Sequence, residues 1–140
     1  MNLETSQLTN FFKGEIIDDG DKLETYSRDA SIFKVKPKMV VYPKDSKDIQ
    51  ALVEFVKDHK GIDPSVSITM RAAGTDMSGG PLGESIVADV TKHINKIGEC
   101  ENGTCTVEPG AFYRDFEKKT LSQGLILPCY TASKSLCAIG

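Results

Sequence analysis

The sequence predicts an α+β fold, and three features carry that prediction. Residues 45–60 have the spacing of an amphipathic surface helix, with apolar side chains recurring every three or four positions. Short strand-like runs at 39–42 and 65–70 flank it, so that strand, helix and strand make a βαβ unit. The remaining elements are expected to be strands at 86–90, 96–100 and 104–107 and a second helix at 111–122.

Composition and charge restrict the class of protein. The chain has 140 residues, 39% of them hydrophobic and 26% charged, which is ordinary for one globular domain. A net charge of -3 provides no basic patch, so we expect no nucleic-acid partner. No apolar run reaches the length of a membrane span, and the start M-N-L-E-T-S lacks a signal-peptide core. We therefore expect a cytoplasmic protein whose four cysteines are reduced thiols.

Residues 1–36 are expected to form an N-terminal helix and arm. Met1–Gly14 spaces four apolar residues among polar ones, which predicts a short amphipathic helix that Gly14 ends. The acidic run Asp18–Asp21 lacks the spacing of a calcium-binding loop and is interpreted as a solvated turn.

Residues 37–108 are expected to form a first, complete subdomain. Its opening strand, Met39–Tyr42, is stopped by Pro43. Asp45 is placed to cap the helix that follows, with Asp48 three residues further on in a pattern like a capping box. Its apolar face is predicted to comprise Ile49, Leu52, Val53 and Val56, and Gly61 is predicted to end it.

A glycine-rich loop, residues 71–80, follows the strand at 65–70 and leads into the strand at 85–90. Glycines at this density are expected where the backbone takes positive φ or lies directly against a ligand, and exposed N–H groups make an anion cradle. The loop matches neither G-x-x-x-x-G-K-[ST] nor a G-x-G-x-x-G that opens a helix. Glycine content alone also fits an ordinary connection between strands.

Residues 97–107 are expected to form a hairpin around Asn102–Gly103, a strong two-residue turn signal. This register places Cys100 opposite Cys105. His59 and His93 have no neighbouring ligand constellation, so no metal site is predicted.

Residues 109–140 are expected to begin a second subdomain that is truncated at the end of the chain. Its helix at 111–122 places Phe112, Phe116 and Thr120 on one face and is closed by Gly124. Leu125–Leu127 is predicted to be a buried strand ended by Pro128, and the rest is a loop.

Five strings in this chain resemble one family in the family's own order. They are Y-S-R-D-A-S (26–31), V-V-Y-P-K-D (40–45), R-A-A-G-T-D-M-S-G-G (71–80), V-E-P-G (107–110) and L-P-C-Y-T-A-S-K-S-L-C-A-I-G (127–140). The family is that of the flavin dehydrogenases and oxidases with a p-cresol methylhydroxylase-type (PCMH-type) FAD domain, which includes D-lactate dehydrogenases, glycolate oxidase subunits and vanillyl-alcohol oxidase. The resemblance covers residues 26–140 and marks the chain as an N-terminal fragment of such an enzyme, carrying the first FAD-binding subdomain and the start of the second.

The resemblance implies that loop 71–80 holds the FAD pyrophosphate through its backbone amides. Some relatives carry a histidine that binds flavin covalently in this loop, and this chain has Thr75 there, so non-covalent FAD is expected. Cys129 stands where relatives often have proline, which departs from the family pattern. The implied cofactor contacts are Arg71, Ala73, Gly74, Thr75, Asp76, Met77, Ser78, Gly79 and Gly80 in the loop, with Pro128, Ser133, Cys137, Ile139 and Gly140 in the second segment.

The resemblance further implies an oxidoreductase that passes a hydride from a 2-hydroxy acid, such as D-lactate or glycolate, to FAD. The alternatives are a non-catalytic nucleotide-binding or interaction module and a reductase of UDP-sugar peptidoglycan precursors with the same fold. No catalytic residue is identified, because the substrate-binding residues are expected beyond Gly140. The fragment alone is expected to bind FAD weakly, to turn nothing over, and to self-associate through its truncated edge.

Overall fold

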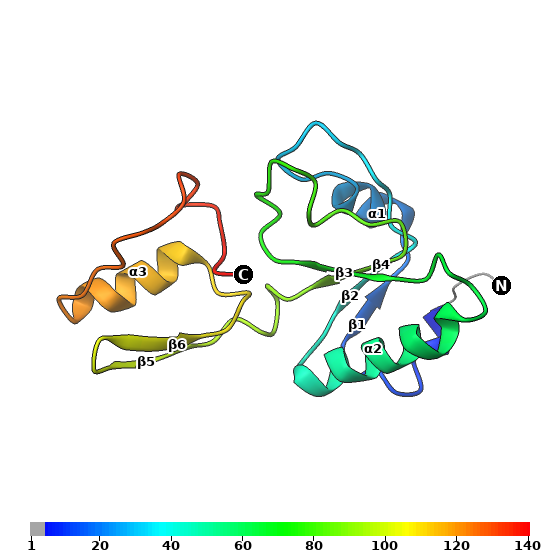
Figure 1. The fold of residues 1–140 in the computed structure, drawn as a ribbon, viewed down its shortest axis with the longest axis horizontal. Coiled ribbons are helices and arrows are strands. Elements are labelled where there is room, and N and C mark those ends of the chain that lie inside the picture. The colour runs from blue at the N-terminus through cyan, green and yellow to red at the C-terminus, as the bar shows by residue number, and fades with distance from the viewer. Residues whose placement is uncertain (1–4) are drawn as a thin grey trace.

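The computed structural model describes residues 5–140 and has two parts (Figure 1). The first is a four-stranded sheet with helices on both faces, and the second is a hairpin covered by one helix. The first part contains the 3₁₀ helix η1 (Thr5–Gln7), β1 (Glu15–Ile17), α1 (Gly20–Tyr26), β2 (Met39–Tyr42), α2 (Ser46–Lys60), β3 (Ile68–Arg71) and β4 (Ile86–Asp89). The second contains β5 (Ile97–Glu101), β6 (Thr104–Val107) and α3 (Tyr113–Ser122). The mixture of helices and strands confirms the predicted α+β class.

The sheet has the strand order β1-β2-β4-β3. β1 is antiparallel to β2, whereas β2, β4 and β3 run parallel. α2 therefore connects two parallel strands, as predicted, but β2 and β3 are not neighbours because β4 lies between them. The sequence could not show this strand order, because it depends on β4, which comes later in the chain than the βαβ unit.

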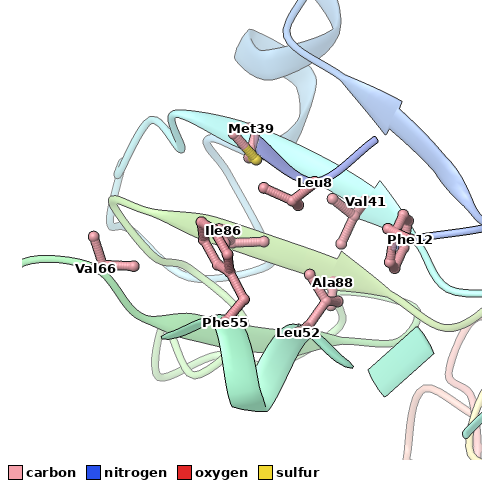
Figure 2. Packing of buried hydrophobic residues seen from close by; sticks show 9 residues of the cluster. All are labelled: Leu8, Phe12, Met39, Val41, Leu52, Phe55, Val66, Ile86 and Ala88. Carbon is pink, nitrogen blue, oxygen red and sulfur yellow. The ribbon is translucent and has the colours of Figure 1, made fainter. Parts of the chain in front are cut away.

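The two faces of the sheet have separate cores. Alternation along β2 sends Met39 and Val41 toward α2 and Val40 toward α1. α1 and α2 lie on opposite faces (Figure 1), so β4 is covered on both sides and all four of its residues are buried. The larger core lies between α2, the N-terminal segment and the sheet (Figure 2), and it contains Leu8, Phe12, Met39, Val41, Leu52, Phe55, Val66, Ile86 and Ala88.

α2 begins and ends as predicted, but its inward face is different. The Asp45 carboxylate accepts the N–H groups of Lys47 and Asp48, which confirms the N-cap. Asp48 does not complete a capping box: it is 2% exposed and accepts from the N–H groups of Lys13 and Lys44 at 3.0 and 2.9 Å. The helix turns Asp48, Leu52 and Phe55 inward and leaves Val53, predicted to be buried, 54% exposed.

The predicted amphipathic helix at the N-terminus is wrong. In the part of residues 1–14 that the structure describes, it is only the single turn η1, followed by irregular chain that buries Leu8 and Phe12; residues 1–4 of that prediction lie outside the described residues. Asp18–Asp21 is exposed, as predicted, but it leads into α1 and does not form only a turn, because Asp19 caps the helix by accepting the N–H of Asp21. α1 has seven residues, too few for a periodic apolar pattern to be visible.

The second part follows its local sequence signals closely. Asn102 and Gly103 both have positive φ, 53° and 77°, as a type I′ turn requires. The register pairs Glu101 with Thr104 and Cys100 with Cys105, which confirms the predicted hairpin. α3 buries Tyr113, Phe116 and Thr120. Phe112, predicted to lie on the inner face of the helix, is its N-cap residue.

Leu125–Leu127 is not the buried strand that the sequence predicts. All three side chains are exposed and the segment forms no strand. A strand must pair its N–H and C=O groups with a neighbour, and this segment pairs with none of the strands in the described residues. None of the helices in residues 5–140 has the length and apolar character that crossing a bilayer requires.

The buried Asp48 carboxylate gives a test of this fold. Replacing Asp48 with alanine leaves the N–H groups of Lys13 and Lys44 without their acceptor, so the free energy of unfolding should fall by about 2 to 4 kcal/mol. Urea unfolding followed by circular dichroism measures the loss. Asp58→Ala, on the exposed side of the same helix, is the matched control and should cost well under 1 kcal/mol. Equal losses from the two variants would contradict this role for Asp48.

Candidate functional site

The candidate site is built on residues 72–85, which join two parallel neighbouring strands without a helix. The segment leaves the end of β3 and returns to the start of β4 as irregular chain. Gly74 and Gly79 have φ of +67° and +86°, a region that side-chain-bearing residues rarely adopt. Gly80, grouped with them in the sequence prediction, has no positive φ. Positive φ at two positions gives the loop a shape that regular structure could not give it.

The loop has a run of N–H groups with no acceptor. The backbone N–H groups of residues 73–77 donate to no acceptor among the described residues. All five residues are at least partly open to solvent. Consecutive free N–H groups on an irregular loop concentrate positive potential and suit an anion with several oxygens, such as a pyrophosphate.

Asp76 lies within this run of residues, and its side chain is exposed but hydrogen-bonded. Its carboxylate accepts both the N–H and the hydroxyl of Ser78, each at 2.7 Å. The Ser78 hydroxyl and N–H lower the pKa of this carboxyl, and the Gly80 N–H adds to the effect. Ser78, predicted as a pyrophosphate donor, is therefore already engaged with another residue of the loop.

A second wall faces the loop and consists of residues 131–140. It is tied to the start of α3: the Tyr113 N–H donates to the Cys137 carbonyl at 3.0 Å, and Ala138 bridges to Phe112. Arg114 donates to the Ser135 carbonyl at 2.9 Å while its guanidinium lies over the Phe112 ring. These contacts hold an otherwise irregular segment in place.

A cavity of about 830 Å³ lies between the two walls. Ser78, Gly79 and Pro128 do not line it, and Pro128 lies in the exposed segment that precedes the second wall. The predicted residues that do line it are Arg71, Ala73, Gly74, Thr75, Asp76, Met77, Gly80, Ser133, Cys137, Ile139 and Gly140. The structure thus brings together two stretches that are fifty residues or more apart in the chain.

Sequence reasoning missed eight lining residues. They are small or apolar residues: Met70, Ala72, Pro81, Val90, Pro109, Thr131, Ala132 and Ala138. Five of them lie within the family strings at 71–80, 107–110 and 127–140, whereas only the fold identifies Met70, Pro81 and Val90. A cavity with free amides on one side and apolar or small side chains elsewhere fits a ligand that joins a pyrophosphate to aromatic rings.

Comparison with known proteins identifies the family of this chain. Residues 37–140 match the family described as FAD binding domain. The chain belongs to this family. FAD is therefore its cofactor, as the sequence resemblance implied, and the PCMH-type recognition is confirmed.

The similar curated proteins are much longer than this chain. It is 32% identical over 88 residues to D-2-hydroxyglutarate dehydrogenase of Escherichia coli K12, covering 61% of this chain and 8% of that protein. It is 26% identical over 132 residues to the enzyme of the same name from Stutzerimonas stutzeri A1501, covering 91% of this chain and 27% of that protein. The chain thus spans 27% or less of the lengths of these two relatives.

Solved structures show the same fold at low sequence identity. Alkyldihydroxyacetonephosphate synthase matches 96% of this chain with a TM-score of 0.78 and 19% identity, over 28% of its own length. p-Cresol methylhydroxylase matches 88% of this chain with a TM-score of 0.70 and 19% identity, over 25% of its own length. These likenesses confirm the predicted fold.

The loop glycines give a second test. Gly79→Ala places a side chain at φ of +86°, with its Cβ about 3.0 Å from the Phe33 ring, and should lower the free energy of unfolding by about 1 to 2 kcal/mol. Gly61→Ala is the control, because Gly61 has ordinary φ and open space around it, and it should change stability little. Chemical denaturation measures both variants. A Gly79→Ala variant as stable as Gly61→Ala would argue against the left-handed conformation.

Proposed function

We propose that this chain is the FAD-binding part of a flavin-dependent dehydrogenase that oxidises a 2-hydroxy acid. Membership of the FAD binding domain family is shown, and both relatives described above are named D-2-hydroxyglutarate dehydrogenase. The names of these relatives make D-2-hydroxyglutarate the first substrate to test, ahead of the D-lactate and glycolate that the sequence suggested. The structural observation that carries the proposal is the run of free N–H groups at 73–77 along one wall of the cavity.

In this proposal the two walls of the cavity contact different parts of FAD. The amides of residues 73–77 and the Thr75 hydroxyl bind the pyrophosphate, while Ser133, Cys137, Ile139 and Gly140 contact the cofactor from the opposite wall. Bound FAD supplies the redox chemistry by accepting a hydride on its flavin ring. The protein binds and orients the cofactor. Thr75 supports non-covalent binding, since it offers no imidazole for attachment.

The predicted division at residues 36 and 108, with a second subdomain that continues past Gly140, is part of this proposal. The hairpin and α3 form a core of their own from Tyr113, Phe116 and Cys137, separate from the cores of the sheet, which supports the second boundary.

A cytoplasmic location is also proposed. All four cysteines are free thiols, including the facing pair Cys100 and Cys105, as expected of a protein in a reducing compartment.

We expect the 140-residue chain alone to bind FAD weakly and to oxidise nothing. Met77 and Ile139 line the cavity yet remain 82% and 40% exposed, so a flavin placed between the walls would keep much of its surface in water. Titration of FAD, ADP and riboflavin into isotope-labelled protein, followed by amide chemical shifts, tests the site. FAD and ADP should move the signals of residues 73–77, whereas riboflavin, which has no pyrophosphate, should not.

The outcomes of that titration are distinct. Shifts confined to other residues would reject the pyrophosphate placement. Sub-micromolar FAD binding, or dye reduction with D-2-hydroxyglutarate or D-lactate, would show that these residues suffice and that the expectation of a partial site is wrong. A nucleotide-binding module without redox activity would bind ADP as tightly as FAD. The same assay on a chain extended to the length of the relatives then measures substrate oxidation.

We further infer that the chain self-associates through the second part. Leu121, Ile126, Leu136 and Ile139 are large apolar side chains that are 40% or more exposed. Sedimentation velocity should show a concentration-dependent dimer that Ile126→Asp combined with Leu136→Asp abolishes. Ile62→Asp, which removes an equally exposed apolar side chain from the first part, is the control and should leave the dimer intact. A monomer at all concentrations would contradict this inference.

A further inference from the structure

Arg71, the last residue of β3, directs its side chain toward a neighbouring segment of the chain. Its Nη2 donates to the Arg28 carbonyl at 2.9 Å, and its Nη1 donates to the Tyr26 carbonyl at 3.5 Å. The guanidinium also lies over the Tyr26 ring, 5.1 Å from its centroid. On another side it meets the loop, because a side chain at Gly74 would collide with the guanidinium. Arg71 is therefore packed between the Tyr26 ring and the backbone at Gly74.

Tyr26 is itself fixed to the sheet. Its hydroxyl lies 2.7 Å from a carboxylate oxygen of Asp89 and 2.7 Å from the Tyr42 hydroxyl. The other Asp89 oxygen accepts the N–H and the hydroxyl of Thr91, at 2.7 and 2.6 Å. Burial and the Asp89 carboxylate both raise the pKa of Tyr26, so its hydroxyl stays protonated and can donate. The ring under Arg71 is thus held by the ends of β2 and β4.

The segment beyond Tyr26 contacts the glycine loop a second time. Its backbone is held by the Arg71 guanidinium at Arg28, and further along the Phe33 ring packs against Gly79. Figure 1 shows the segments 27–38 and 72–85 together at the top of the first part, above the sheet. Within the Y-S-R-D-A-S string at 26–31, Tyr26 provides the ring under Arg71, and the backbone carbonyls of Tyr26 and Arg28 accept from its guanidinium.

We propose that Arg71 is a positioning residue, which together with Tyr26 fixes the conformation of the pyrophosphate-binding loop instead of pairing with the phosphates. The proposal rests on the proposed function and refines the sequence interpretation, in which Arg71 was a cofactor contact. Arg71 lines the cavity, but two of its nitrogens already donate to carbonyls and its plane is stacked. A preorganised loop presents its free N–H groups without an entropic cost at the moment of binding.

Substitution by lysine distinguishes a positioning role of Arg71 from direct pairing with the phosphates. Arg71→Lys keeps the charge but has no planar fork that can reach two carbonyls and stack on a ring. If Arg71 positions the loop, Arg71→Lys should weaken ADP binding about tenfold, and the salt dependence of the remaining binding should be unchanged. Backbone order parameters at residues 73–77 should fall from about 0.85 toward 0.6, while those of β4 stay the same. ADP binding is measured from amide shifts, which detect weak affinities.

Tyr26→Leu tests whether the packing of Arg71 on Tyr26 fixes the loop, and Tyr26 does not line the cavity. It should reproduce the loss of ADP affinity and of loop order, and combining it with Arg71→Lys should add little, because the two side chains act as one unit. Lys118→Met is the control. Lys118 is exposed and pairs with Asp115 on α3, and it contacts neither Tyr26 nor Tyr42, so its loss should change neither quantity.

The results that overturn the proposal are specific. If Arg71→Lys binds ADP like the original chain while Arg71→Gln loses both affinity and salt dependence, Arg71 pairs with the phosphates. If order falls equally in the loop and in β4, Arg71 serves general stability only. If the original chain shows no ADP shifts, the proposed pyrophosphate placement fails, and the order parameters still decide whether Arg71 fixes the loop.

Discussion

Two parallel strands that lie side by side cannot be joined by a tight turn, and much of this structure follows from that constraint. β3 and β4 are such a pair, and the chain between them returns across the sheet without forming a helix. Gly83 lies directly against Thr69 of β3 on the way back. Because the connection is irregular, the N–H groups of residues 73–77 have no ladder or helix partner and stay available to solvent or to a ligand.

An irregular loop needs support from outside itself, and the sheet supplies it at one edge. Tyr42, Arg71 and Asp89 are the last residues of the three parallel strands, and all three meet Tyr26, the last residue of α1. The carboxyl ends of parallel strands are where α/β sheets generally hold their ligands. Here the same edge places a partly buried polar network beneath the loop, so the strands and α1 together hold the loop conformation.

The cavity exists because the second part of the chain returns to the first. Gly140 donates its N–H to the Pro109 carbonyl, and a side chain at Gly110 would collide with the carbonyls of Val90 and Ile94. These close backbone contacts set residues 131–140 opposite the loop. Solved structures at identities near 20% share the overall fold. A site made mainly of backbone amides and small side chains places few demands on residue type, and the redox chemistry belongs to FAD itself.

Local signals in the sequence were sufficient for some elements and for the recognition of the cofactor. Asp45 and Gly61 mark the two ends of α2, and Asn102–Gly103 sets the hairpin register. Both could be predicted because caps and turns depend on residues next to each other in the chain. The family strings identified FAD. Tertiary structure alone decided three other features. These are the role of Asp48 as a buried acceptor, the insertion of β4 between β2 and β3, and the packing of Arg71 on Tyr26. Each depends on which distant segment lies alongside, and the exposed Leu125–Leu127 shows the converse: an apolar run becomes a strand only where a neighbouring strand pairs with its backbone.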